Sequence, residues 1–116
     1  MSSIFVKKSL FHPRTFYFET TWDIAILRFV EKLQNTLSGN IILVVAMPSE
    51  DYFVYGSNVL VVVKDAPIEV RSKILAIVRE VEKSFDDKIG ISPFITTPND
   101  SIIEKFMSVC ETPKLT

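Results

Sequence analysis

Apolar residues recur every three or four positions in a first long stretch of the chain, which is the spacing of a helix with one buried face. The apolar positions are Trp22, Ile26, Val30, Leu33 and Leu37. Thr20 is followed three residues later by Asp23, an acidic variant of the capping box, and Ser38-Gly39-Asn40 supplies a terminating glycine. The pattern predicts a helix that begins near Thr20 or Thr21 and ends near Leu37.

Two further helices are predicted by the same spacing. The longer one has a buried face of Val70, Ile74, Ile77 or Val78, Val81 and Phe85. Lys64-Asp65-Ala66-Pro67 should supply its cap and a proline near its first position, and it should end between Ser84 and Asp87. A short final helix follows a cap at Pro98-Asn99-Asp100.

Continuous apolar runs predict the strands. Ile41 to Met47 and Asn58 to Val63 lack polar alternation, which is typical of strands buried on both faces. Ile91 to Thr97 is a third strand, in which Pro93 indicates a sheet edge or a delayed start. Tyr52 to Tyr55 is either a short strand or the extended side of a loop. The predicted class is α/β (α+β), with helices packed on a small mixed β-sheet.

The first 19 residues form an N-terminal arm or an edge strand of a single domain that spans residues 1–116. Five aromatic residues crowd into this arm: Phe5, Phe11, Phe16, Tyr17 and Phe18. They need burial, either in the sheet of their own domain or against a surface exchanged in an oligomer. We therefore expect a homo-oligomer, most simply a dimer.

Composition excludes several classes of protein. The 13 basic and 14 acidic side chains give a net charge of -1, so a nucleic-acid partner is not favoured. The longest apolar runs, Ile41 to Pro48 and Val59 to Val63, fall far below the ~20 residues of a membrane span. Cys110, the single cysteine, has no disulfide partner within the chain, and no secretory leader pattern is present, so we expect a reducing cytoplasm.

The order of elements is similar to that of a known superfamily. Phe29 to Leu33 leads into the run at 41–47, then Pro48-Ser49, then Val59 to Asp65 and a long amphipathic helix. This succession, over about residues 22–104, resembles the nucleotidyltransferase domain of the polymerase-beta-like superfamily, above all its small stand-alone archaeal and bacterial members. The resemblance favours an archaeal source. The chain has one glutamine in 116 residues, and this low content favours a thermophile.

In that superfamily a strand ends in Gly-Ser and Asp-x-Asp opens the next strand. The two carboxylates hold a divalent metal, a third acid on a neighbouring strand helps activate the attacking hydroxyl, and Gly-Ser cradles phosphates. Matching Leu60 to Asp65 to the second strand puts Gly56 and Asn58 at the aspartate positions and Pro48-Ser49 at Gly-Ser. Because these acids are missing, we expect no catalytic residue, metal or cofactor.

Two sets of residues remain candidates for a site. Ser49, Ser57 and Asn58 could bind a phosphate or a nucleotide through hydroxyl and amide groups, or the serines could bond their own turns. Glu50, Asp51 and Asp65 could form a rearranged metal site. Alternatively, Glu50-Asp51 is a solvated turn and Asp65 a helix cap.

These observations lead to one functional hypothesis and one alternative. The hypothesis is a non-catalytic nucleotidyltransferase-like protein that acts through protein–protein interaction, as a homodimer or with a partner, with residual nucleotide or phosphate binding. The alternative is a metal-dependent nucleotidyltransferase with a rearranged acidic site. The resemblance also implies a helical protein partner of the HEPN type.

Overall fold

The structure is a computed structural model that describes residues 5–8 and 21–111. Its elements in chain order are β1 (Phe5–Lys8), α1 (Thr21–Leu37), β2 (Ile41–Ala46), β3 (Val59–Val63), α2 (Ile68–Ser84), β4 (Pro93–Thr96) and α3 (Ile102–Glu111). The predicted order of three helices and three strands from residue 21 onwards is confirmed, and so is the α+β class.

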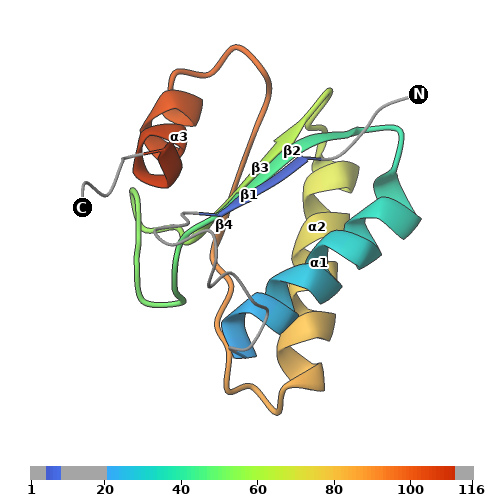
Figure 1. Cartoon of the computed structure of the whole chain (residues 1–116). Coiled ribbons are helices and arrows are strands. Elements are labelled where there is room, and N and C mark those ends of the chain that lie inside the picture. Colours follow the sequence, from blue (N-terminus) through green and yellow to red (C-terminus); the bar gives the residue numbers. More distant parts are fainter. Residues whose placement is uncertain (1–4, 9–20, 112–116) are drawn as a thin grey trace, which may run out of the picture.

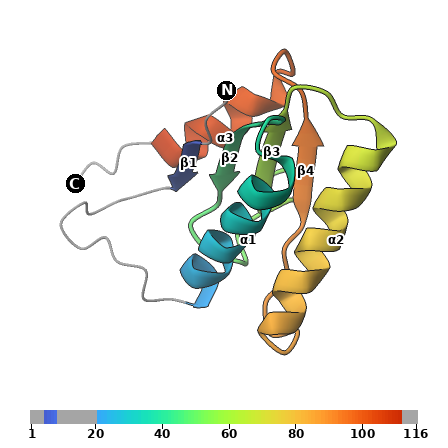
Figure 2. The same cartoon turned by 90° about the vertical axis from the view of Figure 1, so that its right-hand side faces the viewer.

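The four strands form one mixed sheet in the order β1-β2-β3-β4. β2 and β3 are antiparallel, whereas β1 runs parallel to β2 and β4 parallel to β3. α1 and α2 cover one face of this sheet and α3 covers the other (Figures 1 and 2). The sheet is therefore the middle layer of three.

Both faces of the two central strands are buried, as their unbroken apolar runs predicted. Val44, Val61 and Val63 pack with Phe29 and other residues of α1 and α2. On the opposite face, a second cluster beneath α3 consists of Val45, Met47, Leu60, Val62 and Phe106. Since alternate side chains of a strand point to opposite faces, one apolar run supplies both cores.

Only part of the predicted N-terminal arm is described. Phe5–Lys8 forms β1 at one edge of the sheet. The rest of the segment 1–19, including the aromatic stretch Thr15 to Glu19, lies outside the described residues, and so does the predicted capping residue Thr20.

The predicted role of Asp65 as a helix cap is wrong. The N-cap of α2 is Pro67, and no side chain caps it. The backbone N–H of Asp65 donates to Oδ1 of Asn40 and its carbonyl accepts from Nδ2 of Asn40, both at 3.1 Å. Asp65 lies two residues before the N-cap, in a link between the start of β2 and the exit of β3.

The predictions for the C-terminal third of the chain agree better with the structure than the prediction for Asp65. α2 ends at Ser84, inside the predicted interval. β4 begins at Pro93 and lies at an edge of the sheet, so the delayed start and the edge position that this proline indicated are both confirmed. Oδ1 of Asp100 accepts a hydrogen bond from the N–H of Ile102 at 3.0 Å, which is the cap expected for α3. Within the described residues, no helix is both long and apolar enough to cross a bilayer.

Candidate functional site

The loop between β2 and β3 ends in a tight hairpin turn. Val54 and Ser57 exchange two backbone hydrogen bonds of 2.8 and 3.0 Å around Tyr55 and Gly56. Both turn residues have positive φ, 51° and 77°, as a type I′ turn requires. Of the predicted short strand Tyr52 to Tyr55, only Val54 pairs. We call residues 52–57 the aromatic hairpin; in Figure 1 it belongs to the green loop on the α3 side of the sheet.

Three aromatic side chains of this hairpin face solvent. Tyr52 is 46% exposed, Phe53 51% and Tyr55 66%, whereas Val54 packs against the cluster beneath α3. The other large apolar side chains that are exposed in the described part of the chain are aliphatic and lie on α1 and α2. Among residues 21–109, the exposed aromatic rings therefore gather in this hairpin.

Asn58 fixes the base of the hairpin. It is fully buried, and its Nδ2 donates to the carbonyls of Glu50 at 2.9 Å and Gly90 at 3.0 Å. Its Oδ1 accepts from the N–H of Ser92 at 2.8 Å, and its backbone bonds Ser92 and Met47 at 3.0 Å. The side chain thus joins the β2–β3 loop to the segment that leads into β4. Both of its amide protons are used, so the amide has no donor left for a phosphate.

Carboxylates and an indole reinforce the same region. Oε2 of Glu50 accepts from the N–H of Gly90 at 2.8 Å, and Oε2 of Glu82 accepts from the N–H of Ile91 at 3.0 Å. Nε1 of Trp22 donates to the carbonyl of Met47 at 2.9 Å. Glu50 therefore has a structural bond that neither the metal interpretation nor the solvated-turn interpretation anticipated.

The three acids proposed for a rearranged metal site do not converge. Glu50 and Asp51 precede β3 and Asp65 follows it, and a strand of five residues spans about 17 Å. Within the described residues, no group of three or more His, Cys, Asp or Glu side chains is close enough to hold a metal ion.

The two serine candidates differ in exposure and in their hydrogen bonds. Ser49 is exposed and its carbonyl accepts from the N–H of Tyr52 at 3.2 Å. Ser57 is buried, and both of its backbone polar groups are used in the bridge to Val54. Gly56 lies in the turn rather than in β3, so side chains at 56 and 58 would not leave the same side of a strand. Positions 56 and 58 therefore do not form the pair of carboxylate positions that the resemblance implies.

The aromatic hairpin lies in an acidic segment. Residues 47–58 contain Glu50 and Asp51 and no lysine or arginine. The ion pairs formed among described residues lie elsewhere: Lys32 with Glu80 at 3.2 Å, and Arg79 with Glu82 at 2.8 Å and with Asp87 at 3.6 Å. In this part of the chain, the exposed Asp51 carboxylate has no cationic partner.

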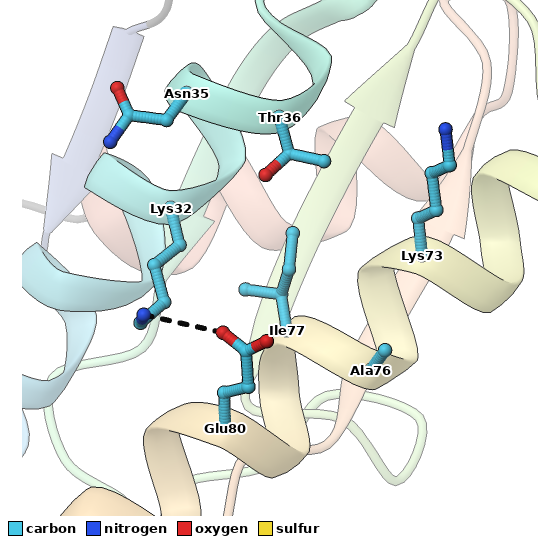
Figure 3. A pocket seen from close by; sticks show the side chains of 7 residues that line it. All are labelled: Lys32, Asn35, Thr36, Lys73, Ala76, Ile77 and Glu80. Atoms are coloured by element: carbon cyan, nitrogen blue, oxygen red, sulfur yellow. Dashed lines mark ion pairs between the residues drawn. The ribbon is translucent and has the colours of Figure 1, made fainter.

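A groove of about 320 Å³ between α1 and α2 is a second candidate. Its lining is Lys32, Asn35, Thr36, Lys73, Ala76, Ile77 and Glu80 (Figure 3). Lys32 is neutralised by Glu80, Lys73 points away from that ion pair, and of the lining residues only Ile77 is buried. The groove lacks the converging polar groups of a ligand site.

Sequence reasoning missed the aromatic hairpin as a unit, although one signal was present. Glycine at the second position is typical of a two-residue turn between strands, and Tyr55-Gly56 has that glycine, although Asn or Asp is preferred before it. The contacts of Glu82 and Asn58 with residues 90–92 join segments more than eight residues apart and left no local signal.

Comparisons with known proteins identify no relative. No protein-family model, curated protein or solved structure matches this chain.

Proposed function

We propose that this chain is a non-catalytic, nucleotidyltransferase-like domain that works by binding another protein chain, and that the aromatic hairpin makes the contact. The observation that carries the proposal is the exposure of Tyr52, Phe53 and Tyr55 on a hairpin whose base is held by a buried asparagine.

Aromatic residues are enriched at protein interfaces, where a few of them supply most of the binding energy. A contact that is already ordered loses less conformational entropy on binding. The aromatic hairpin is ordered by the hydrogen bonds between Val54 and Ser57 and by those of Asn58. The hairpin has both properties that a contact surface needs: apolar rings and a fixed backbone.

The backbone of Tyr55 adds independent support. Its φ of 51° belongs to a region that glycine and asparagine adopt easily and that a bulky residue adopts at a cost of order 1–2 kcal/mol. Its ring is 66% exposed, so packing within the domain does not offset that cost. Strain of this kind clusters at functional positions.

The absence of catalysis is inferred from the positions that the resemblance singles out. Position 56 lies in a turn, the amide protons of Asn58 are committed, and the acids on either side of β3 are far apart. The same geometry lends no support to phosphate binding through Ser49, Ser57 and Asn58. A homodimer and a helical partner are the two forms of association that we propose.

Two measurements test the proposal. Light scattering over a wide concentration range compares the wild-type chain with Phe53→Ser. We expect the wild type to associate and the variant to shift toward the monomer, whereas Ile68→Ala, at an equally apolar exposed position on α2, should not. Calorimetry with magnesium and nucleoside triphosphates should give no heat and no product. Turnover of a nucleotide would overturn the non-catalytic assignment.

A further inference from the structure

The charge around the aromatic hairpin indicates what kind of partner it fits. Asp51 is exposed and Glu50 half-buried, so the segment brings negative charge next to three exposed rings. Within residues 47–58 no basic side chain offsets this charge, and no ion pair reaches Asp51 from elsewhere in the described chain. The segment 47–58 is both aromatic and anionic.

Such a surface attracts cations in two ways. The face of an aromatic ring carries negative potential, which binds an arginine or lysine side chain. A nearby carboxylate adds an attraction that decays over roughly 8–10 Å at moderate salt. The two effects favour the same occupant, and arginine suits it best because its planar guanidinium stacks on rings and bonds carboxylates.

The same charge disfavours two other occupants. If two copies met hairpin to hairpin, the carboxylates of Asp51 and Glu50 would face like charges from the other copy, so a homodimer would place the hairpin against a different surface of the second copy. A nucleic acid would stack on the rings but would bring its phosphates to the same carboxylates. The hairpin also offers little enclosure for a small molecule, because its three aromatic rings are exposed.

We propose that the aromatic hairpin binds an arginine-rich segment of a partner protein, with guanidinium groups stacked on Tyr52, Phe53 or Tyr55 and paired with Asp51. This proposal rests on the proposed function, since it specifies the partner of the same hairpin. The arginine-rich partner is a narrower proposal than protein binding, because a hairpin that bound only apolar surfaces would still satisfy the proposed function.

The test uses two synthetic probes and the full chain. One probe is a twelve-residue peptide of alternating arginine and serine, acetylated and amidated, and the other has glutamine in place of arginine. Calorimetric titration measures affinity. Amide chemical shifts show whether residues 50–57 are the ones perturbed. We expect saturable one-to-one binding of the arginine peptide, weaker at high salt, and no binding of the glutamine peptide.

Four variants make the assignment specific. Tyr55→Asn removes a ring while keeping a residue that accepts positive φ, so the hairpin still folds. We expect it to weaken binding about two- to fivefold, the range of an exposed cation–π contact. Asp51→Asn should weaken binding by a similar factor. Ile68→Ala and Glu69→Gln remove an exposed apolar residue and an acid at the start of α2, beyond the opposite end of β3, and should leave the affinity unchanged.

Each other result has a defined meaning. If both peptides bind equally and Tyr55→Asn weakens both, the cationic partner is overturned while the hairpin remains an interaction surface. If the arginine peptide binds with affinity unaffected by Tyr55→Asn and Asp51→Asn, or does not bind, the cationic partner is likewise overturned. If, in addition, no substitution in the hairpin alters any association of the chain, the proposed function falls as well.

Discussion

The amide of Asn58 donates to the carbonyl of Glu50 at 2.9 Å, across a separation of eight residues that includes the whole aromatic hairpin. The same Nδ2 reaches Gly90 at 3.0 Å, so one buried side chain closes the loop and attaches it to the segment before β4. The hairpin is consequently held at its base by a side chain and at its tip by the paired backbone of Val54 and Ser57.

Removing this side chain should destabilise the domain strongly. Asn58→Ala leaves the carbonyls of Glu50 and Gly90 and the N–H of Ser92 without their partner. At about 1–3 kcal/mol for each buried polar group left unsatisfied, and with water reaching some of them, we expect a loss of about 3 kcal/mol. Urea unfolding measures it, and a loss below about 1 kcal/mol would contradict the role assigned to Asn58.

Asn58→Asp should differ from Asn58→Ala in its pH dependence. The introduced carboxyl would be fully buried and would lie beside the carbonyls of Glu50 and Gly90, and burial and these carbonyls raise its pKa above the value in the unfolded chain. The N–H of Ser92 favours the charged form, but it is a single donor against two acceptors and burial. A group with a raised folded pKa loses its stabilising contribution as pH rises above the unfolded value, near 3.9. The free energy of unfolding of Asn58→Asp should therefore fall relative to Asn58→Ala between about pH 4 and pH 7, and a constant difference would rule out this explanation.

Tyr55→Asn should stabilise the isolated domain. Asparagine adopts the positive φ of the first turn position more easily than tyrosine, and Asn-Gly is a preferred pair in this type of turn. The lost ring is mostly exposed, so we expect a gain of about 0.5–1 kcal/mol with an unchanged dependence on urea concentration. A destabilised variant would mean that the ring packs against the domain in solution.

Acid should loosen the junction between β4 and α3. Oδ2 of Asp100 accepts from Oγ1 of Thr96 and Oδ1 accepts from the N–H of Ile102, and these two bonds hold the pKa of the Asp100 carboxyl below its usual value. A lowered folded pKa means that the stabilisation is present above the unfolded pKa of about 3.8 and is lost as pH falls through the folded value.

Asp100→Asn is the variant that tests this junction. It should be less stable than the wild type at pH 6, with a difference that narrows below pH 4. Asp51→Asn, at an exposed carboxyl without these donors, is the control. Amide hydrogen exchange of α3 at pH 6 and pH 3 would show whether the helix loosens locally. Equal protection at both pH values would contradict the stabilising role of the Asp100 hydrogen bonds.

Phe106 should be the main anchor of α3. It is fully buried beneath the helix and lies 6.2 Å from Phe94 between ring centroids. Phe106→Ala should cost about 3–5 kcal/mol, the usual range for deleting a buried phenylalanine, whereas Leu75→Ala, half-exposed on α2, should cost far less. Thermal or urea unfolding checks both, and similar losses for the two would show that α3 is not held by this core.

Elements that depend on local pattern were predictable from the sequence. α1 begins and ends where the apolar spacing indicated, because a helix needs only one periodic face. The predicted left-handed glycine cap is wrong, since Gly39 does not have a positive φ. The two central strands followed from unbroken β-branched runs, since such runs are stable only when both faces are covered. The edge position of β4 followed from Pro93, which lacks a backbone N–H for a second neighbour.

The candidate site was decided by tertiary structure. Asp65 was predicted as a cap but bonds Asn40, 25 residues away, because β2 and β3 are antiparallel and bring the ends of the two strands together. Asn58 was predicted as a ligand residue but is committed to residues 90–92, which the parallel pairing of β3 and β4 places beside it. Sequence alone determined the helices and strands from residue 21 onwards, since these depend on local composition. Only the fold decided which polar groups are already satisfied and which rings stay exposed, because hydrogen bonds and burial depend on residues distant in the chain.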